Sequence, residues 1–106
     1  MPYVQYHGTP IEVDEDGFLA DPSIWNADLA RFMAEDAEGI KDLTDDHWKV
    51  INYLHKYYTD FGVAPMVRRL CKDTGITIDR IYELFSSGPA KGACKIAGLP
   101  KPTGCV

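Results

Sequence analysis

The sequence contains few cysteines and no long apolar run. Three of its 106 residues are cysteine, at positions 71, 94 and 105, and three widely spaced cysteines do not make a disulfide framework. No apolar run approaches the roughly 18 residues that a membrane-spanning helix needs. The first ten residues also lack the basic and apolar regions of a secretory signal peptide. We therefore expect a protein of the reducing cytoplasm, with no segment inserted in a membrane.

Patterns typical of metal sites and hydrolases are also missing. The cysteines are 23 and 11 residues apart, no CxxC occurs, and the three histidines are scattered. Structural zinc sites, by contrast, use closely spaced cysteine and histidine ligands. The acidic stretch at 14–17 is too short for a calcium-binding EF-hand loop, and no local signature of a serine or cysteine hydrolase is present. We expect neither a bound metal nor hydrolase chemistry.

Acidic and basic residues are unevenly distributed along the chain. Residues 1–46 contain twelve acids and two bases, whereas residues 47–106 contain nine bases and four acids, for a net charge of −5. One interpretation is an acidic first half that keeps the protein soluble. The other is that the basic second half faces an acidic surface of a partner.

The length and composition predict one domain, 1–106, with a core of its own, because 45% of the residues are hydrophobic. We expect 1–98 to form a helical body and 99–106 a flexible C-terminal arm, since Pro100 and Pro102 disfavour regular structure. The predicted fold class is mainly α. It is a small orthogonal helical bundle with an N-terminal β-hairpin, a helix-turn-helix-like portion and a mobile C-terminal arm.

Apolar periodicity and turn residues predict the order of the elements. An apolar period near 3.6 residues indicates each helix, and polar caps, glycines and prolines mark the ends. The expected elements are strands at 3–7 and 11–13 joined by a turn at 8–10, and helices at 26–37, 45–61, 65–73, 78–85 and 89–97.

Several positions within these elements carry specific expectations. Asn26 is expected to cap the first helix, and Thr44 or Asp45 the second. Pro65 is expected in the first turn of the third helix. Trp25 and Phe61 belong to the apolar stripes of the first two helices and are expected to face the core.

The last nineteen residues, GPAKGACKIAGLPKPTGCV, hold two of the three cysteines and no acidic residue. Lys91 and Lys95 lie near Cys94, and nearby cations favour a thiolate over a thiol. Cys105 is the penultimate residue, and chain ends that are not tied down are mobile. An extended arm from Leu99 to Cys105 reaches about 20–25 Å, enough to meet Cys94 or to enter a cleft in another protein. We interpret Cys105 as a mobile sulfur-handling thiol and Cys94 as its resolving partner. The alternative for Cys94 is a core cysteine that packs with Ile96 and Ala97.

The helices at 65–73 and 78–85 are similar in layout to a helix-turn-helix. A low pI, about 5.0, and the shortage of bases on the second helix disfavour DNA binding. A DNA-binding redox regulator is kept as an alternative, although we do not expect nucleic acid to be the partner. Cys71, on the apolar side of the first of these helices, is expected to be structural. Four basic residues lie on or near the motif: Arg68, Arg69, Lys72 and Arg80.

The tail closely resembles the C-terminus of the DsrC family, small sulfur-trafficking proteins described as the gamma subunit of dissimilatory sulfite reductase. The tail motif is highly specific, and weaker pieces upstream support it. The resemblance implies a helical fold with an N-terminal hairpin and a mobile C-terminal arm, and it covers nearly the whole chain. The upstream pieces are VDEDGFL at 13–19, YY at 57–58, APMVR at 64–68 and YELF at 82–85.

The resemblance also implies a function. The arm would insert into a cleft of the sulfite reductase and bring Cys105 to the siroheme. Cys94 matches the second redox cysteine of the family, and a sulfite-derived sulfur would bridge the two cysteines as a trisulfide, which a membrane-bound complex would reduce. The chain would be a protein co-substrate rather than an enzyme alone. It would bind no cofactor itself, because the siroheme and iron–sulfur clusters would belong to its partner.

The related TusE-like proteins keep only the terminal cysteine and relay persulfide sulfur towards 2-thiouridine in tRNA. Both cysteines are present here, so the resemblance favours DsrC proper, with a TusE-like relay as the alternative. Lys91, Lys95 and Lys101 would suit docking to a partner and anionic sulfur species. That assignment follows from charge rather than from a family motif. The direction of the pathway, sulfite reduction or sulfur oxidation, stays open.

Overall fold

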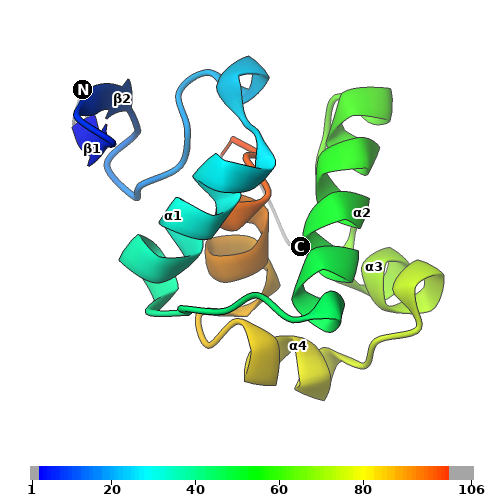
Figure 1. The fold of residues 1–106 in the computed structure, drawn as a ribbon. Helices are drawn as coiled ribbons and strands as arrows, with labels where there is room; N and C mark the ends of the chain where they lie inside the picture. The colour runs from blue at the N-terminus through cyan, green and yellow to red at the C-terminus, as the bar shows by residue number, and fades with distance from the viewer. Residues whose placement is uncertain (1–2, 101–106) are drawn as a thin grey trace.

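The protein is described by a computed structural model, which covers residues 3–100 and forms a mainly helical fold with an N-terminal hairpin (Figure 1). This confirms the predicted fold class. None of the helices in this range is both long and apolar enough to cross a membrane. The elements are strands β1 (Tyr3–Tyr6) and β2 (Thr9–Glu12), the 3-10 helix η1 (Pro22–Ile24), helices α1 (Ala27–Glu38), α2 (Asp45–Phe61), α3 (Val67–Thr74) and α4 (Ile78–Leu84), and the π-helix η2 (Pro89–Cys94).

The hairpin turn is shorter than the sequence predicted. Strands β1 and β2 are antiparallel with Tyr6 opposite Thr9, so that His7 and Gly8 alone make the turn. Both have positive φ, 49° and 80°, the combination that a two-residue type I′ turn needs to match the strand twist. The expected turn at 8–10 was therefore wrong. Pro10 belongs to β2, where it is tolerated because a strand of a two-stranded sheet has a free edge.

Local polar caps explain where the main helices begin. The Asn26 side chain accepts a hydrogen bond from the Leu29 amide at the start of α1, as predicted. Thr44 caps α2 in a reciprocal arrangement with His47, whose Nδ1 accepts a hydrogen bond from the Thr44 amide at 3.0 Å. These caps are encoded within one turn of sequence, which is why they could be predicted. The helices α1, α2 and α3 each end at a glycine of positive φ: Gly39, Gly62 and Gly75.

The connection between α2 and α3 differs from the expectation. Helix α3 begins at Val67, because Met66 has an extended ψ of 147°, so Pro65 lies before the helix rather than in its first turn. Phe61, expected to face the core, is 64% exposed, and Val63 and Met66 beside it are also exposed. Phe61 is the last residue of α2, and it is not among the side chains that form the core or pack against it.

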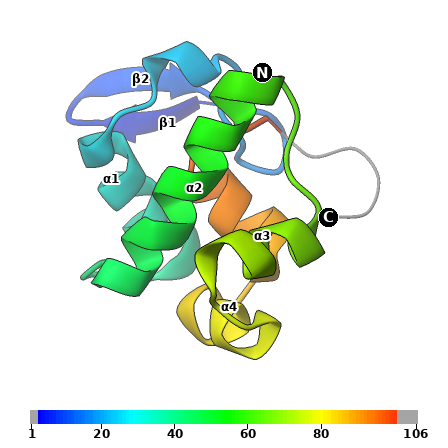
Figure 2. The same ribbon diagram turned by 90° about the vertical axis from the view of Figure 1, so that its right-hand side faces the viewer.

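The core lies between α1, α2 and the C-terminal segment 93–99. Figure 1 shows this orange-to-red segment between α1 and α2, and Figure 2 shows it behind α2 from the side. η2 packs against α2. This segment is thus the centre of the core. Leu99 was expected to begin the flexible arm, and that expectation was wrong, because its side chain is fully buried. The side chains with no solvent exposure are mostly from α2 and this segment: Val50, Ile51, Leu54, Ala93, Cys94, Ile96, Ala97 and Leu99.

Candidate functional site

Cys94 is the last residue of η2 and has no solvent exposure. Ala93 before it and Ile96 two residues after it are equally buried, whereas Lys95 between Cys94 and Ile96 is half-buried. Burial raises the pKa of the Cys94 thiol from its ordinary value of 9.0 to about 12, because a thiolate there would lose its hydration. At neutral pH only about one molecule in 10⁵ would carry a thiolate at this position.

The expectation that Lys91 and Lys95 favour the Cys94 thiolate was wrong for this conformation. Lys91 is exposed. The Lys95 ammonium lies 5.3 Å from the centroid of the Phe18 ring, and its side chain passes over Gly17. The loss of hydration at Cys94 therefore outweighs the charge of its neighbours. Sequence proximity indicated two cations near the sulfur, but it could not indicate on which side of the backbone they lie.

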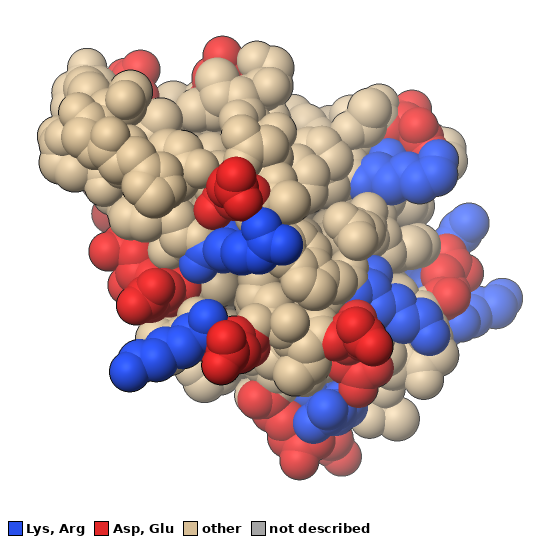
Figure 3. All heavy atoms as spheres, in the orientation of Figure 1, with Lys and Arg blue, Asp and Glu red and all other residues tan. Residues whose placement is uncertain are grey.

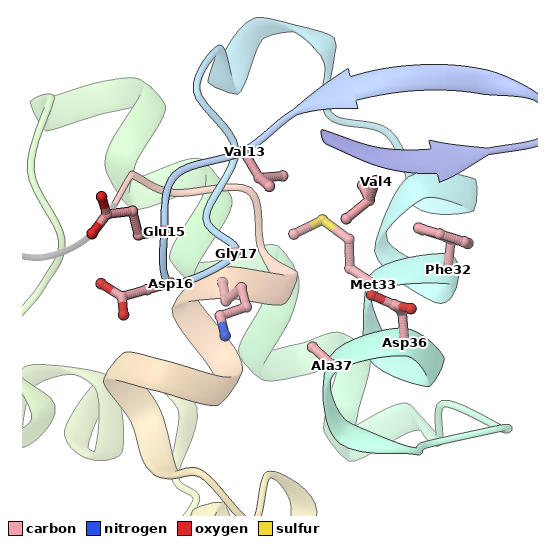
Figure 4. Close-up of a pocket in the computed structure, with 10 residues that line it drawn as sticks. Val4, Val13, Glu15, Asp16, Gly17, Phe32, Met33, Asp36 and Ala37 are labelled. Carbon is pink, nitrogen blue, oxygen red and sulfur yellow. The ribbon is translucent and has the colours of Figure 1, made fainter. Parts of the chain in front are cut away.

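Lys95 is the basic residue of a pocket of about 300 Å³ between the hairpin and α1 (Figure 4). Val4, Val13 and Met33 face one another across its apolar part. The lining also includes three acidic residues: Glu15, Asp16 and Asp36. The carboxylates give this pocket an acidic character, which would repel anionic groups from Lys95. Lys91, outside this pocket, is therefore the better candidate for a contact with anionic groups.

The backbone of η2 is packed tightly at Gly92, a buried position that faces the end of α1. A Cβ added at Gly92 would overlap a carboxylate oxygen of Glu38 and would lie 3.0 Å from Cβ of Phe85. The Glu38 carboxylate accepts hydrogen bonds from the Ser87 amide at 3.1 Å and the Ser87 hydroxyl at 2.9 Å. Glu38 thus joins the end of α1 to the loop before η2. A π-helix is a rare, widened turn that is often found at functional sites.

A capping motif ends the helical segment after Cys94. The Leu99 amide donates to the Cys94 carbonyl at 3.1 Å, and the Gly98 amide donates to the Lys95 carbonyl at 3.1 Å. With Gly98 at a φ of 81°, this is a Schellman motif. Because Leu99 is buried, the described chain is anchored up to the residue before Pro100.

Two distant side chains complete this helix end. The Trp25 indole Nε1 donates to the Ile96 carbonyl at 2.8 Å. Nδ1 of His55 lies 3.0 Å from the Ala97 carbonyl oxygen, which makes Nδ1 the protonated nitrogen, since a carbonyl only accepts. The two rings stack with centroids 3.9 Å apart. The sequence placed Trp25 in an apolar stripe and His55 among scattered histidines. No local signal marks a contact between residues 71 and 42 positions apart.

The other predicted site residues have mixed outcomes. Cys105 and Lys101 lie outside the described residues, as does the arm from 101 to 106. Cys71 is a half-buried free thiol packed against the core, which fits the structural role expected of it. Within 3–100, no cluster of three or more histidine, cysteine or acidic side chains could hold a metal ion.

The basic residues of α3 and α4 are partly neutralised. Arg69 pairs with Asp73 at 2.9 Å, and Arg80 pairs with Asp46 at 3.2 Å. Figure 3 shows acidic and basic side chains intermixed on the visible face rather than a continuous basic surface. These pairs weaken the case for DNA binding, because phosphate contacts need several free cations on one face.

Comparisons with known proteins identify the family. A family model described as DsrC-like protein matches residues 5–106. The chain is 54% identical over 106 residues to the dissimilatory-type sulfite reductase subunit gamma of Nitratidesulfovibrio vulgaris (strain Hildenborough), with 100% of both chains covered. It is 38% identical over 110 residues to the sulfurtransferase TusE of Pectobacterium atrosepticum, covering 97% of this chain and 99% of that protein.

The fold agrees as well. The crystal structure of the oxidized gamma-subunit of the dissimilatory sulfite reductase from Archaeoglobus fulgidus is similar with a TM-score of 0.87 and 46% identity, covering 99% of this chain and 100% of that one. The family model and these relatives span nearly the whole chain. The chain therefore belongs to the DsrC-like protein family.

Proposed function

We propose that this chain is a sulfur carrier and redox co-substrate of dissimilatory sulfite reductase. The observation that carries the proposal is the 54% identity with a gamma subunit over the full chain, together with two cysteines in the tail. Its site of action is the cytoplasm, where thiols stay reduced. The siroheme and iron–sulfur clusters belong to the reductase, and this chain supplies thiols rather than a cofactor.

The proposed chemistry is a trisulfide between Cys94 and Cys105. One sulfite and two thiols, with two electrons and four protons from the reductase system, give the trisulfide and three water molecules. Cys105 takes up the partly reduced sulfur, and Cys94 closes the bridge, because thiol exchange proceeds by attack of one sulfur on another. A second, membrane-bound reductase would supply four electrons and four protons, which return both cysteines to thiols and release the bridging sulfur as hydrogen sulfide.

The positions of the lysines support part of the docking role. Lys91 is exposed on η2, where it can meet an acidic partner surface or an anionic sulfur species. Lys95 and Lys101 belong to the same proposed contact, with weaker support for Lys95 because of its acidic surroundings. The basic residues at this end of the chain contrast with the acidic first half.

Intact-protein mass spectrometry tests this function. The reduced protein is mixed with sulfite, a reductant and a dissimilatory sulfite reductase. We expect the mass to increase by one sulfur atom and decrease by two hydrogens, and expect no such change in Cys94→Ser or Cys105→Ser variants. Cys71→Ser is the matched control and should behave as the parent. No sulfur uptake by any form would contradict the proposal.

A persulfide relay of the TusE type is the second candidate. It is favoured by the 38% identity with a TusE sulfurtransferase and by the burial of Cys94, which would leave Cys105 to act alone. In the same experiment this candidate predicts sulfur held on Cys105 equally well in the Cys94→Ser variant.

A further inference from the structure

The helix end after Cys94 satisfies all four of its terminal carbonyls. The last four carbonyls of a helix have no partner within it and must find one elsewhere. Those of Cys94 and Lys95 accept the Leu99 and Gly98 amides in the Schellman motif. The next two, of Ile96 and Ala97, accept from Trp25 and His55 and from no other group that donates to them in the described chain. Two side chains from other elements therefore complete the motif: Trp25, directly after η1, and His55 of α2.

The rings press directly on the backbone at this point. A Cβ at Gly98 would overlap the Trp25 ring, so that only glycine fits between the capping motif and the indole. Ile96 and Ala97 are fully buried, whereas the Trp25 and His55 residues are half-buried. The two carbonyls therefore cannot form hydrogen bonds with water unless the segment moves. The stacked rings are partly exposed, so that a partner protein could contact them.

We propose that Trp25 and His55 are positioning residues for the sulfur exchange, which together fix the segment 94–99, hold the Cys94 thiol in the core and set how often it is exposed. The role in sulfur exchange rests on the proposed sulfur-carrier function. The effect of the two side chains on the exposure of Cys94 does not depend on that function. The clasp, meaning the stacked Trp25 and His55 with their two hydrogen bonds, fixes the point from which the arm begins.

The chemistry of the exchange explains why such a clasp matters. A buried thiol is protected from oxidants and from unrelated disulfides, but it also cannot attack a sulfur on Cys105. Opening must be local, because unfolding the whole chain for every turnover would destroy the docked complex. Releasing two buried carbonyls from their donors opens this segment, because its other hydrogen bonds within the described chain are local backbone bonds of its own helix end and its remaining contacts with the core are mainly apolar and non-directional.

The test measures the exposure of Cys94 directly. In a Cys71→Ser, Cys105→Ser background, Cys94 is the one thiol, and its alkylation by iodoacetamide is followed by intact mass under native conditions. Trp25→Phe keeps an aromatic ring for stacking but removes the donor. His55→Phe likewise keeps an aromatic ring and removes the donor to the Ala97 carbonyl. His55→Asn restores an N–H near the position of Nδ1. Trp48→Phe is the matched control, since Trp48 is another half-buried tryptophan, in contact with Arg31.

Loss of either donor is expected to speed Cys94 alkylation by about 3- to 10-fold, the effect of one hydrogen bond. His55→Asn should recover most of the protection of Cys94 from alkylation. In Trp48→Phe, Cys94 should be alkylated at the parent rate after correction for any change in global stability. Urea unfolding of each variant separates local from global opening. The clasp is contradicted if alkylation is unchanged, or if it rises only in proportion to the loss of global stability.

This result can be distinguished from a failure of the proposed function. The alkylation assay contains no sulfite and no reductase, so it reports on the clasp even if the chain carries no sulfur. Conversely, a trisulfide formed at the parent rate in both donor-less variants would leave the sulfur-carrier function standing and overturn the role of the clasp.

Discussion

At the scale of single residues, the protonation state of Cys94 bears directly on the order of steps in the proposed sulfur chemistry. The thiol is fully buried and its pKa is raised to about 12 by the loss of hydration. A cysteine in this state is a poor nucleophile at neutral pH. In the proposed mechanism, the first covalent step therefore belongs to Cys105, and Cys94 acts second, once its own segment has opened.

The raised pKa predicts a loss of stability at high pH. Cys94 keeps its proton in the folded protein, whereas in the unfolded chain it loses that proton above a pH near 9. The stabilisation is therefore complete below pH 9 and is lost as the pH rises towards 12. We expect the free energy of unfolding to fall by about 1 kcal/mol more between pH 8 and 10 in the parent than in Cys94→Ala.

Urea unfolding at several pH values measures this difference. Tyr53 also has a pKa raised to about 12, first by burial and then by its hydrogen bond to Asp73, so both proteins should carry Tyr53→Phe to remove a second titration. Parallel pH profiles for the parent and Cys94→Ala would mean that the thiol is hydrated in solution.

At the scale of elements, η2 approaches the end of α1 so closely at Gly92 that there is no space for a side chain. Gly92 has an ordinary backbone conformation, since its φ is not positive, so glycine is required there by space alone. The carboxylate of Glu38 and the Phe85 side chain occupy the volume that a Cβ would need. This contact joins the end of α1 to the helix that carries Cys94.

Gly92→Ala should therefore destabilise the fold by about 1–3 kcal/mol, the usual cost of adding a methyl group to a filled core. Thermal or urea unfolding measures the loss. Combining it with Glu38→Ala should cost less than the sum of the two single changes, because the shorter side chain frees part of the space. Strict additivity of the two changes would show that Glu38 is not what excludes the methyl group.

The elements also show what could be predicted from the sequence. The caps at Asn26 and Thr44 were predicted because donor and acceptor lie within one helical turn. The burial of Cys94 was only one of two alternatives that its sequence left open, and the contacts of Trp25 and His55 with the segment 94–99 could not be predicted. These contacts join residues dozens of positions apart, and only the packing of α1, α2 and η2 brings them together. Periodicity likewise marked Phe61 as apolar without showing that its helix ends beyond the core.

At the scale of the whole molecule, charge favours a protein partner over nucleic acid. The net charge is −5, and Arg69 and Arg80 are held in ion pairs with acidic side chains. Because binding to DNA depends on releasing counterions from many phosphates, the helix pair α3–α4 has too few free cations for tight binding.

We expect no binding to a fluorescent duplex DNA at micromolar protein, even at low salt, in an anisotropy titration. The experiment should be carried out with the reduced and the oxidised protein, because a redox regulator would bind in one state. Salt-dependent binding at sub-micromolar concentration in either state would favour the DNA-binding alternative over the sulfur carrier.

The central claim is that one sulfur atom bridges Cys94 and Cys105, and tryptic peptide mapping tests it most directly. Trypsin cleaves after Lys91 and Lys95 but not at the Lys101–Pro102 bond, so Cys94 falls in the peptide 92–95 and Cys105 in the peptide 96–106. After turnover with sulfite and the reductase, non-reducing digestion at mildly acidic pH should give these two peptides joined, with the mass of a disulfide plus one sulfur. Reductant should separate them. A joined species without the additional sulfur, or sulfur found on the 96–106 peptide alone, would contradict the claim.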